Sequence, residues 1–361
     1  MTALTMPALP EEETSLRPVP WRRMAWVTWR QHRIMLASLA AFLGALAVCV
    51  WKVGLGLHHA YAAAATCHPA SSPICDRLVT SFAGMDVFLA NGYVLQAVPA
   101  LIGAFAGAPV LARELETGTF RYAWTQGFGR QRWTLAKLVP LAVAITVVMG
   151  AFTVLLSWYY QPYLHASTPA ALGLPDQSPL VDLFALHGVA FAAWTLAAFA
   201  IGALAGMLTR RVVPAMAATL AGYAGLAFAA GLYLRQHYLS PRVARNLFNP
   251  PGSAWVTGQW WTKGGTTIRQ SAMNHLMTSM FYRMFPQVHR SAAKGSTVRA
   301  QKFRTNFDIF HYLTQHGYTE WTKYQPASRF WPFQWIEGGW LFALSVLLIV
   351  ATVWLVGRRA A

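Results

Sequence analysis

Six long stretches of apolar residues determine what this chain can fold into. Each is long enough to cross a hydrocarbon core about 30 Å thick, which needs roughly 20 residues. Because a segment in lipid must satisfy its backbone hydrogen bonds internally, each stretch is predicted to be an α-helix. The predicted spans are about 34–57, 87–112, 138–160, 183–208, 212–234 and 338–357. Only 11% of the residues are charged, against about a quarter in soluble domains. The sequence therefore predicts an all-α polytopic membrane protein.

Basic residues set the predicted orientation, because Lys and Arg in short loops and near span ends stay in the cytoplasm. With both termini in the cytoplasm, the short outer loops hold only Lys52 and Arg77. The basic residues then on the cytoplasmic side are Arg17, Arg22, Arg23, Arg30, Arg33, Arg113, Arg121, Arg130, Arg132, Lys137, Arg210, Arg211, Arg358 and Arg359. The other basic residues lie in a long outer segment, 235–336, whose length exempts it from the rule. Since the net charge of +17 is divided between the two sides without a dense basic run, nucleic acid is not a predicted partner.

The N-terminal region precedes the first span. Residues 1–20 contain several Pro and Glu residues and are predicted to be a disordered tail. Residues 21–33 have aromatic residues on one helical face and basic residues on the other, which favours an interfacial helix on membrane lipid; a positive flank that only fixes topology is the alternative. The residues assigned to this helix are Trp21, Arg22, Arg23, Trp29, Arg30 and Arg33. Cleavage after the first span, as in a signal peptide, is less favoured because the leader is too long.

Two cysteines follow the first span on the predicted outer side. Cys67 and Cys75 flank the sequence HPASSPI, and disulfides persist outside the cytoplasm. Closing so short a loop would stabilise the fold by roughly 2 to 3 kcal/mol. We expect a disulfide, with two free thiols as the alternative because spacing alone does not prove pairing.

The outer segment 235–336 is too polar to span the membrane and too aromatic for a simple linker. Two apolar stripes recur in it at helical spacing, Met273, Met277, Met280 and Met284, then Phe303, Phe307 and Phe310. They predict the core of a small helical cap rather than a ligand site. Its basic residues face only Asp308 and Glu320, so an anionic neighbour is expected, with lipid headgroups as the first candidate.

The sequence contains none of the motifs that would carry catalysis or metal binding. It has no G-x-x-x-x-G-K-[ST] phosphate loop, H-E-x-x-H, C-x-x-C or G-x-S-x-G. We therefore expect no catalytic residue, no metal site and no cofactor in this chain. His187 is the only ionisable residue well inside a predicted span, whereas ion-coupled carriers usually keep carboxylates there. A secondary transporter, or a membrane-anchored binding protein or enzyme of the cell envelope, remains an alternative.

A polar segment, GAPVLARELETGTFRYAWTQGFGRQRW at 107–133, separates the second and third spans. The second helix is predicted to continue past Ala112 until Gly118 breaks it, and Thr119 could cap a short helix that stops at Gly127. Aromatic and Arg side chains are preferred anchors of protein interfaces. This pattern predicts that Phe120, Arg121 and Trp124 face a protein partner.

Three motifs, ARELETGTFRYAWTQGFGRQRW, YQPASRFWPFQWIEGGWLFAL and WVTWRQHR, resemble the type-2 ABC exporter permeases of actinobacteria over essentially the whole chain. The resemblance implies that the E-x-E-x-G-T segment, with Glu114, Glu116, Gly118 and Thr119, docks into a separate ATPase subunit, which binds the ATP and Mg²⁺. With this implication, the predicted partner-coupling residues are Arg113, Glu114, Glu116, Gly118, Thr119, Phe120, Arg121, Trp124 and Gln126. It also implies a second permease copy, identical or paralogous, above two ATPases in the cell (plasma) membrane. We expect an exporter subunit without catalytic residues, and the apolar spans suit a hydrophobic or amphipathic cargo.

The predicted organisation follows from these assignments. It consists of a cytoplasmic tail at 1–20, the interfacial helix at 21–33, five spans at 34–234 with the coupling region 113–133, an outer helical segment at 235–336, and a sixth span with a cytoplasmic tail at 337–361.

Overall fold

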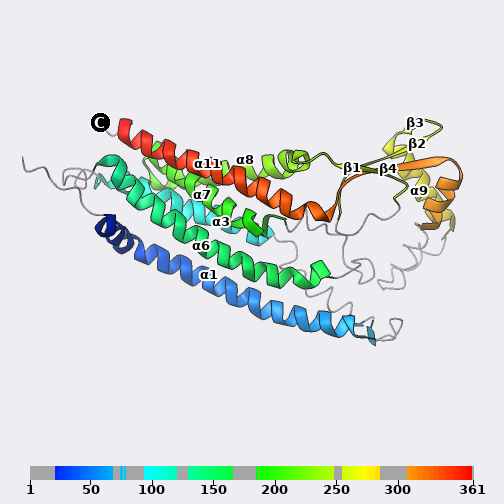
Figure 1. Ribbon diagram of the computed structural model, residues 1–361, viewed down its shortest axis with the longest axis horizontal. Coiled ribbons are helices and arrows are strands. Elements are labelled where there is room, and N and C mark those ends of the chain that lie inside the picture. The colour runs from blue at the N-terminus through cyan, green and yellow to red at the C-terminus, as the bar shows by residue number, and fades with distance from the viewer. Residues whose placement is uncertain are drawn as a thin grey trace, which may run out of the picture.

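The computed structural model is a long bundle of helices with a small sheet beyond one of its ends (Figure 1). It describes residues 21–67, 74–75, 77–78, 93–119, 129–165, 184–186, 188–247, 254–284 and 307–359. The described chain starts and finishes at the same end of the bundle, which we call the base. The opposite end is called the sheet end.

Six described helices are long and apolar enough to cross a membrane, which confirms the predicted number. They are Trp26–Ala65, Leu95–Thr117, Arg130–Pro162, Gly188–Thr209, Val212–His237 and Ala327–Arg358. The helical elements that form them are α1 (Trp21–Ala65), α3 (Tyr93–Ile102), η1 (Gly103–Gly107), α4 (Ala108–Thr117), α6 (Arg130–His165), α7 (Gly188–Thr209), α8 (Val212–Ala229), η3 (Ala230–Leu234), η4 (Arg235–His237), η5 (Ala327–Arg329) and α11 (Phe330–Arg359), with η2 (Phe184–Leu186) just before α7.

The predicted interfacial helix at 21–33 and the predicted first span at 34–57 form one continuous helix, α1. No Gly or Pro separates the two ranges, so nothing in the local sequence ends the helix between them. An α-helix satisfies its backbone hydrogen bonds internally, so the same helix can contain both the polar residues 21–33 and the apolar residues that follow. Trp29, Arg30 and Arg33 are exposed on it, while the side chains of Trp21, Arg22 and Arg23 lie outside the described part.

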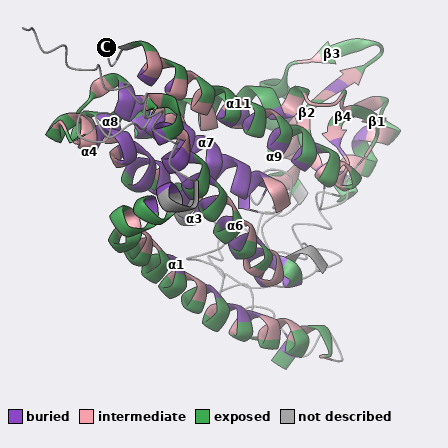
Figure 2. Cartoon of the chain, turned by 60° about the vertical axis from the view of Figure 1, so that its left-hand side comes forward, coloured by how far each residue is buried: buried purple, intermediate pink, exposed green. Residues whose placement is uncertain are grey.

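Helix α7 lies at the centre of the bundle. It contacts α3, α4, α6, α8 and α11, and almost every residue from Ala190 to Met207 is buried. Figure 2 shows this buried helix enclosed by helices whose outer faces are exposed. A helix that is apolar on all sides is stable only when surrounded, by protein or lipid. The many Ala and Gly residues of α7 let its neighbours approach closely.

Two glycine pairs bring the second span onto α7. The sequences GAFAG at 103–107 and GALAG at 202–206 both have the G-x-x-x-G spacing that lets helix backbones meet. A Cβ atom added to Gly206 would lie 2.5 Å from the carbonyl oxygen of Ala108, and one added to Gly107 would lie 2.6 Å from that of Phe199. Because these neighbours are backbone atoms, no side-chain rotation could relieve the overlap.

The segment between the fifth and sixth spans contains a four-stranded sheet, so the prediction of an all-helical outer segment at 235–336 is wrong. Its strands are β1 (Arg242–Arg245), β2 (Trp255–Lys263), β3 (Thr266–Ile268) and β4 (Tyr318–Gln325), in the order β1-β4-β2-β3 with every pair antiparallel. Aromatic and Thr residues dominate β2 and β4, and both favour strands.

The predicted Met stripe does form a helix, α9 (Gln270–Met284). Together with a helix that includes residues 307–315, it covers one face of the sheet. Trp261 packs there with Met273, Ile309 and Leu313. These apolar contacts confirm a packed core that includes Met273, to which the sheet contributes Trp261, Ile268 and Tyr318. Phe303 lies outside the described residues.

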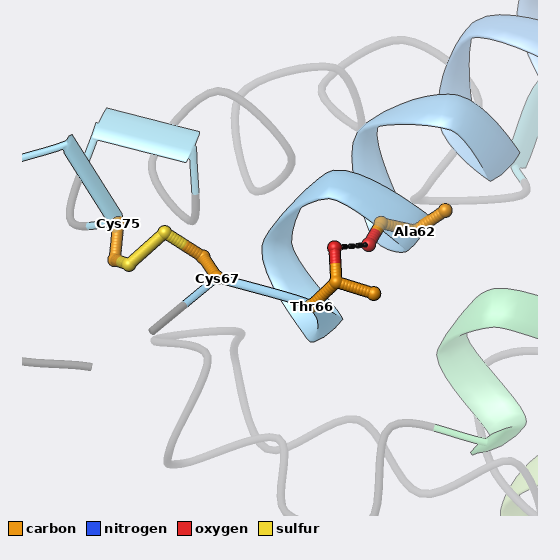
Figure 3. The surroundings of a disulfide bond; sticks show 4 residues. All are labelled: Ala62, Thr66, Cys67 and Cys75. Atoms are coloured by element: carbon orange, nitrogen blue, oxygen red, sulfur yellow. Dashed lines mark hydrogen bonds between the residues drawn. A yellow bond between two sulfur atoms is a disulfide. The ribbon is translucent and has the colours of Figure 1, made fainter. Parts of the chain in front are cut away.

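A disulfide joins Cys67, just after α1, to Cys75, with their Cα atoms 5.6 Å apart (Figure 3). Immediately before it, the hydroxyl of Thr66 donates a hydrogen bond to the carbonyl oxygen of Ala62 at 2.8 Å, which satisfies one of the last carbonyls of the helix. Both cysteines lie at the sheet end. Cys49 is a free thiol on the exposed side of α1.

Glu320 on β4 is buried, with only 7% of its surface exposed. Its Oε2 has no hydrogen-bond partner, and its cross-strand neighbours on the same face, Trp261 and Gln259, do not titrate. Burial raises the pKa of Glu320 from 4.5 to about 7, because removal from water disfavours the charged carboxylate.

We predict that Gly206→Leu drives the second span away from α7 and lowers the stability of the bundle. Overpacking typically costs about 1 to 3 kcal/mol. Thermal unfolding of the purified chain in detergent measures the loss. Gly225→Leu on α8 is the matched control, since an added Cβ there meets nothing within 4 Å. Equal melting temperatures for the two variants would contradict the assigned contact.

A second prediction concerns pH. Between about pH 4.5 and 7 the unfolded chain releases the Glu320 proton while the folded chain keeps it, so the stability of the sheet should fall as pH rises through this window. Glu320→Gln should remove this pH dependence and be the more stable form at pH 8. Hydrogen exchange of β4 amides between pH 5 and 8 is the measurement. Stability that rises across this window would rule out the buried neutral carboxyl.

Candidate functional site

The candidate coupling site lies at the base, where α4 ends. The prediction that the second helix ends at Gly118 is confirmed, because α4 stops at Thr117 and Gly118 has φ +70°. Glycine adopts this left-handed conformation without the steric cost that a Cβ would add. The Thr117 hydroxyl donates to the carbonyl of Arg113 at 2.9 Å and lies 3.1 Å from the Thr119 hydroxyl. The chain therefore leaves the helix at a fixed point.

Glu114 connects α4 to α6 by an ion pair with Lys137. Lys137 is only 3% exposed, and its ammonium also lies 4.2 Å from the ring centre of Trp133. A buried ammonium requires such partners, because leaving it unpaired costs several kcal/mol. At the neighbouring residue of α6, the Thr28 hydroxyl is within hydrogen-bond distance of the Ala136 carbonyl, at 3.2 Å, so α1 contacts α6 at the same level.

Glu116 connects α4 to α8. Its Oε2 accepts a hydrogen bond at 3.0 Å from the backbone N–H of Val212, the first residue of α8. Arg211, the N-cap residue of α8, makes no capping hydrogen bond. Glu116 therefore supplies from another helix the carboxylate that a helix N-terminus favours.

The two carboxylates of the E-x-E motif thus act on opposite sides of α4. Residues two positions apart on an α-helix point about 200° away from each other. Glu114 reaches α6 on one side and Glu116 reaches α8 on the other. The start of the segment between the second and third spans is consequently held by the third and fifth spans at once, and the glycine pairs hold it against the fourth.

The structure places only part of the predicted coupling set. Arg113, Glu116 and Thr119 are exposed, and Glu114 is half-buried. Phe120, Arg121, Trp124, Gln126 and the predicted stop at Gly127 lie outside the described residues.

A second polar site, the sheet-end cluster, joins three spans at the opposite end and was missed by sequence reasoning. Arg235 donates two hydrogen bonds to Glu337, from Nε to Oε2 at 3.0 Å and from Nη2 to Oε1 at 2.9 Å. Trp194 of α7 donates to Oε1 at 2.7 Å, and Tyr238 donates to Oε2 at 3.2 Å. Trp340 donates to the Tyr238 hydroxyl at 2.8 Å. Glu337 is fully buried, and each of its oxygens accepts two hydrogen bonds.

Neighbouring groups complete the cluster. The Arg235 guanidinium lies 4.4 Å from the ring centre of Phe184. Gln334 accepts a hydrogen bond from the backbone N–H of Ala190 at 2.9 Å and donates one to the carbonyl of Phe184 at 2.8 Å, which satisfies groups at the start of α7. Burial, then the nearby Glu337 carboxylate, raises the pKa of Tyr238 above its ordinary value, so Tyr238 remains a hydrogen-bond donor.

These contacts explain the sequence YQPASRFWPFQWIEGGW, whose polar residues interrupt an apolar span. Gln325 donates to the carbonyl of Leu239 at 2.7 Å, and Arg329 donates to that of Ser240 at 2.6 Å, so the motif ties the start of the sixth span to the chain that follows the fifth. A Glu near the start of a span and an Arg near the end of another could have indicated this pair. The deep residue suggested by the sequence, His187, lies outside the described residues.

Six long apolar helices with few charged residues indicate a multi-pass membrane protein, as in a transporter permease. The model of the family described as ABC-2 membrane transporter related matches residues 40–235. The chain belongs to this family and is an ABC-2 type permease, a transmembrane subunit whose family implies association with an ABC ATPase. No match was found among curated proteins or solved structures. The matched range ends at Arg235, before the sheet begins.

We predict that Arg235→Met destabilises the sheet-end cluster strongly, by about 3 to 5 kcal/mol, because it leaves the Glu337 carboxylate buried without its cation. Adding Glu337→Gln should restore part of this loss, since the neutral amide needs no cation and its one oxygen can still accept a hydrogen bond from Trp194. Thermal unfolding of the wild type, both single variants and the double variant gives the coupling energy. Additive losses would show that the two residues act independently.

Proposed function

We propose that this chain is the membrane-spanning half of an ATP-driven exporter, in which two permease copies, identical or paralogous, stand on two ABC ATPases. The ATPases bind the ATP and Mg²⁺, and the permease carries no catalytic residue. The base faces the cytoplasm and the sheet faces outward across the plasma membrane, in agreement with the charge distribution. The apolar spans suit a hydrophobic or amphipathic cargo.

The two-sided attachment of α4 is the observation that carries this proposal. A displacement of the segment after Gly118 acts on a helix end that Glu114 ties to α6 and Glu116 ties to α8. The close glycine contacts transmit the same displacement to α7. One push from a docked ATPase therefore tilts four spans together, which a flexible connection could not achieve.

Helix α7 provides the connection between the two ends. Its 22 residues extend about 33 Å at 1.5 Å per residue, a full hydrocarbon core. Gly206 contacts α4 near the base, and Trp194 contacts Glu337 near the sheet end. Closure of the ATPases at the base can thus change the packing of the fifth and sixth spans at the far end, and so the accessibility of a path between the two permeases.

Variants of the coupling site distinguish binding of the ATPase from transmission of its movement to the spans. Trp124→Ala should weaken ATPase binding, since truncating an interface anchor costs 2 kcal/mol or more, about thirtyfold in affinity. Glu116→Ala should leave the ATPase bound but reduce cargo-stimulated ATP hydrolysis, because α8 loses its link to α4. Co-purification and ATPase assays in liposomes measure the two effects.

Asp308→Asn, which removes an exposed acid at the sheet end, is the control and should change neither property. Normal binding and normal stimulated hydrolysis in both Trp124→Ala and Glu116→Ala would reduce the segment to a simple connector. The proposed coupling role would then be wrong.

A further inference from the structure

The sheet has two faces of different character. The alternation of strand residues and the register of the pairs place Trp261, Glu320, Lys263 and Arg242 on the face covered by α9. We call the other side the open face. It consists of Val243, Arg245, Gly258, Trp260, Thr262, Thr267, Thr319, Trp321 and Lys323, with Trp255 and Gln325 at the end nearest the spans. Trp255 packs against the cluster around Phe184 and Trp194, whereas none of the first nine residues belongs to a hydrophobic cluster in the described part of the chain.

Two tryptophans form the centre of the open face. Trp260 and Trp321 are cross-strand partners, with ring planes 8° apart and centres 6.4 Å apart. The Trp321 indole donates to the Thr262 hydroxyl at 3.1 Å, which fixes the orientation of the ring. Large aromatic side chains are normally buried in a core or an interface. A half-buried tryptophan pair without a packing partner in the described chain therefore indicates a binding surface.

The positive charge of the open face indicates an anionic partner. Arg245 lies opposite Trp321, and Lys323 lies opposite Gly258; both are exposed, and neither makes an ion pair within the described chain. The face contains no acidic residue. Threonine hydroxyls surround the indoles on the side away from these two cations. The surface therefore offers flat apolar rings, hydroxyl groups and positive charge together.

In the proposed orientation the open face lies beyond the headgroups if the hydrocarbon ends near Glu337, which favours a partner other than lipid. From Arg358 to Glu337, α11 extends about 32 Å, which spans the hydrocarbon core even with an average tilt. Residues before Glu337 add about 15 Å of helix, more than a headgroup layer of about 5 to 8 Å. From Gln325, β4 continues about 13 Å farther to Trp321, and Figure 1 shows the sheet beyond the end of the bundle.

We propose that the open face binds an acidic glycan of the extracellular space. Sugar rings present C–H faces that pack on indoles, their hydroxyls match the surrounding threonines, and their carboxylates or phosphates pair with Arg245 and Lys323. This inference rests on the proposed orientation of the permease. It is independent of which cargo the permease exports.

Binding to the purified full chain in nanodiscs of zwitterionic lipid tests the proposal. The probes are an oligogalacturonate, a neutral malto-oligosaccharide of equal length, a polyglutamate peptide and an oligothymidylate. The oligogalacturonate should bind at least tenfold more tightly than the other three. Trp260→Ala should weaken its binding about tenfold or more, and Trp260→Phe, which keeps an apolar ring, should weaken it less.

Charge variants provide the matched control. Replacing Arg245 and Lys323 by Gln should weaken binding and flatten its salt dependence. Replacing Arg242 and Lys263 by Gln removes the same charge from the covered face and should have little effect. Equal losses in the two double variants, or binding of polyglutamate or oligothymidylate as tight as that of the glycan, would overturn the proposal.

A labelling experiment separates this inference from the function on which it rests. Lys263→Cys in intact cells should react with a membrane-impermeant maleimide. Absence of labelling would overturn the extracellular placement, and with it the glycan as partner. By contrast, normal ATPase binding and stimulation in Trp124→Ala and Glu116→Ala would contradict the coupling role but would not affect the proposal for the open face.

Discussion

The contact between two glycine pairs and the backbone of the neighbouring helix is the constraint on which the rest of the structure depends. Gly103 and Gly107 let the second span approach α7 until backbone meets backbone, with Gly202 and Gly206 opposite. In lipid no hydrophobic force drives helices together, so close packing of this kind must supply the attraction. The position of α4, and hence of Glu114 and Glu116, follows from it.

Charge is handled in the same way at both ends of the bundle. Lys137 and Glu114 pair near the base, and Arg235 and Glu337 pair near the sheet end. A buried charge without a partner is costly, while a buried pair often contributes little net stability compared with apolar residues. Such pairs therefore specify which helices meet rather than how tightly they hold. Each pair lies between spans that the proposed transport cycle has to move.

The sheet extends the molecule beyond the sixth span (Figure 1). Its attachment is short, because β4 ends at Gln325 and the sixth span starts at Ala327, while Gln325 and Arg329 bind the chain after the fifth span. A load on the sheet would thus act directly on the two spans that share the Arg235 and Glu337 pair. A ligand bound on the open face and an ATPase docked at the base would act on the same helices from opposite ends.

The sequence by itself determined the six spans, because about 20 consecutive apolar residues have no other stable place than lipid. It also determined the end of α4, since Gly118 permits a backbone conformation that other residues avoid. Only the tertiary structure decided the partners of the polar residues. Glu116 and Val212 are 96 positions apart, and Arg235 and Glu337 are 102 apart. No local pattern records such pairs, because they exist only after the helices have packed. The sheet escaped prediction for the same reason: the Met stripe of α9 gives a clear helical period, whereas β2 and β4 become strands only by pairing across 54 intervening residues.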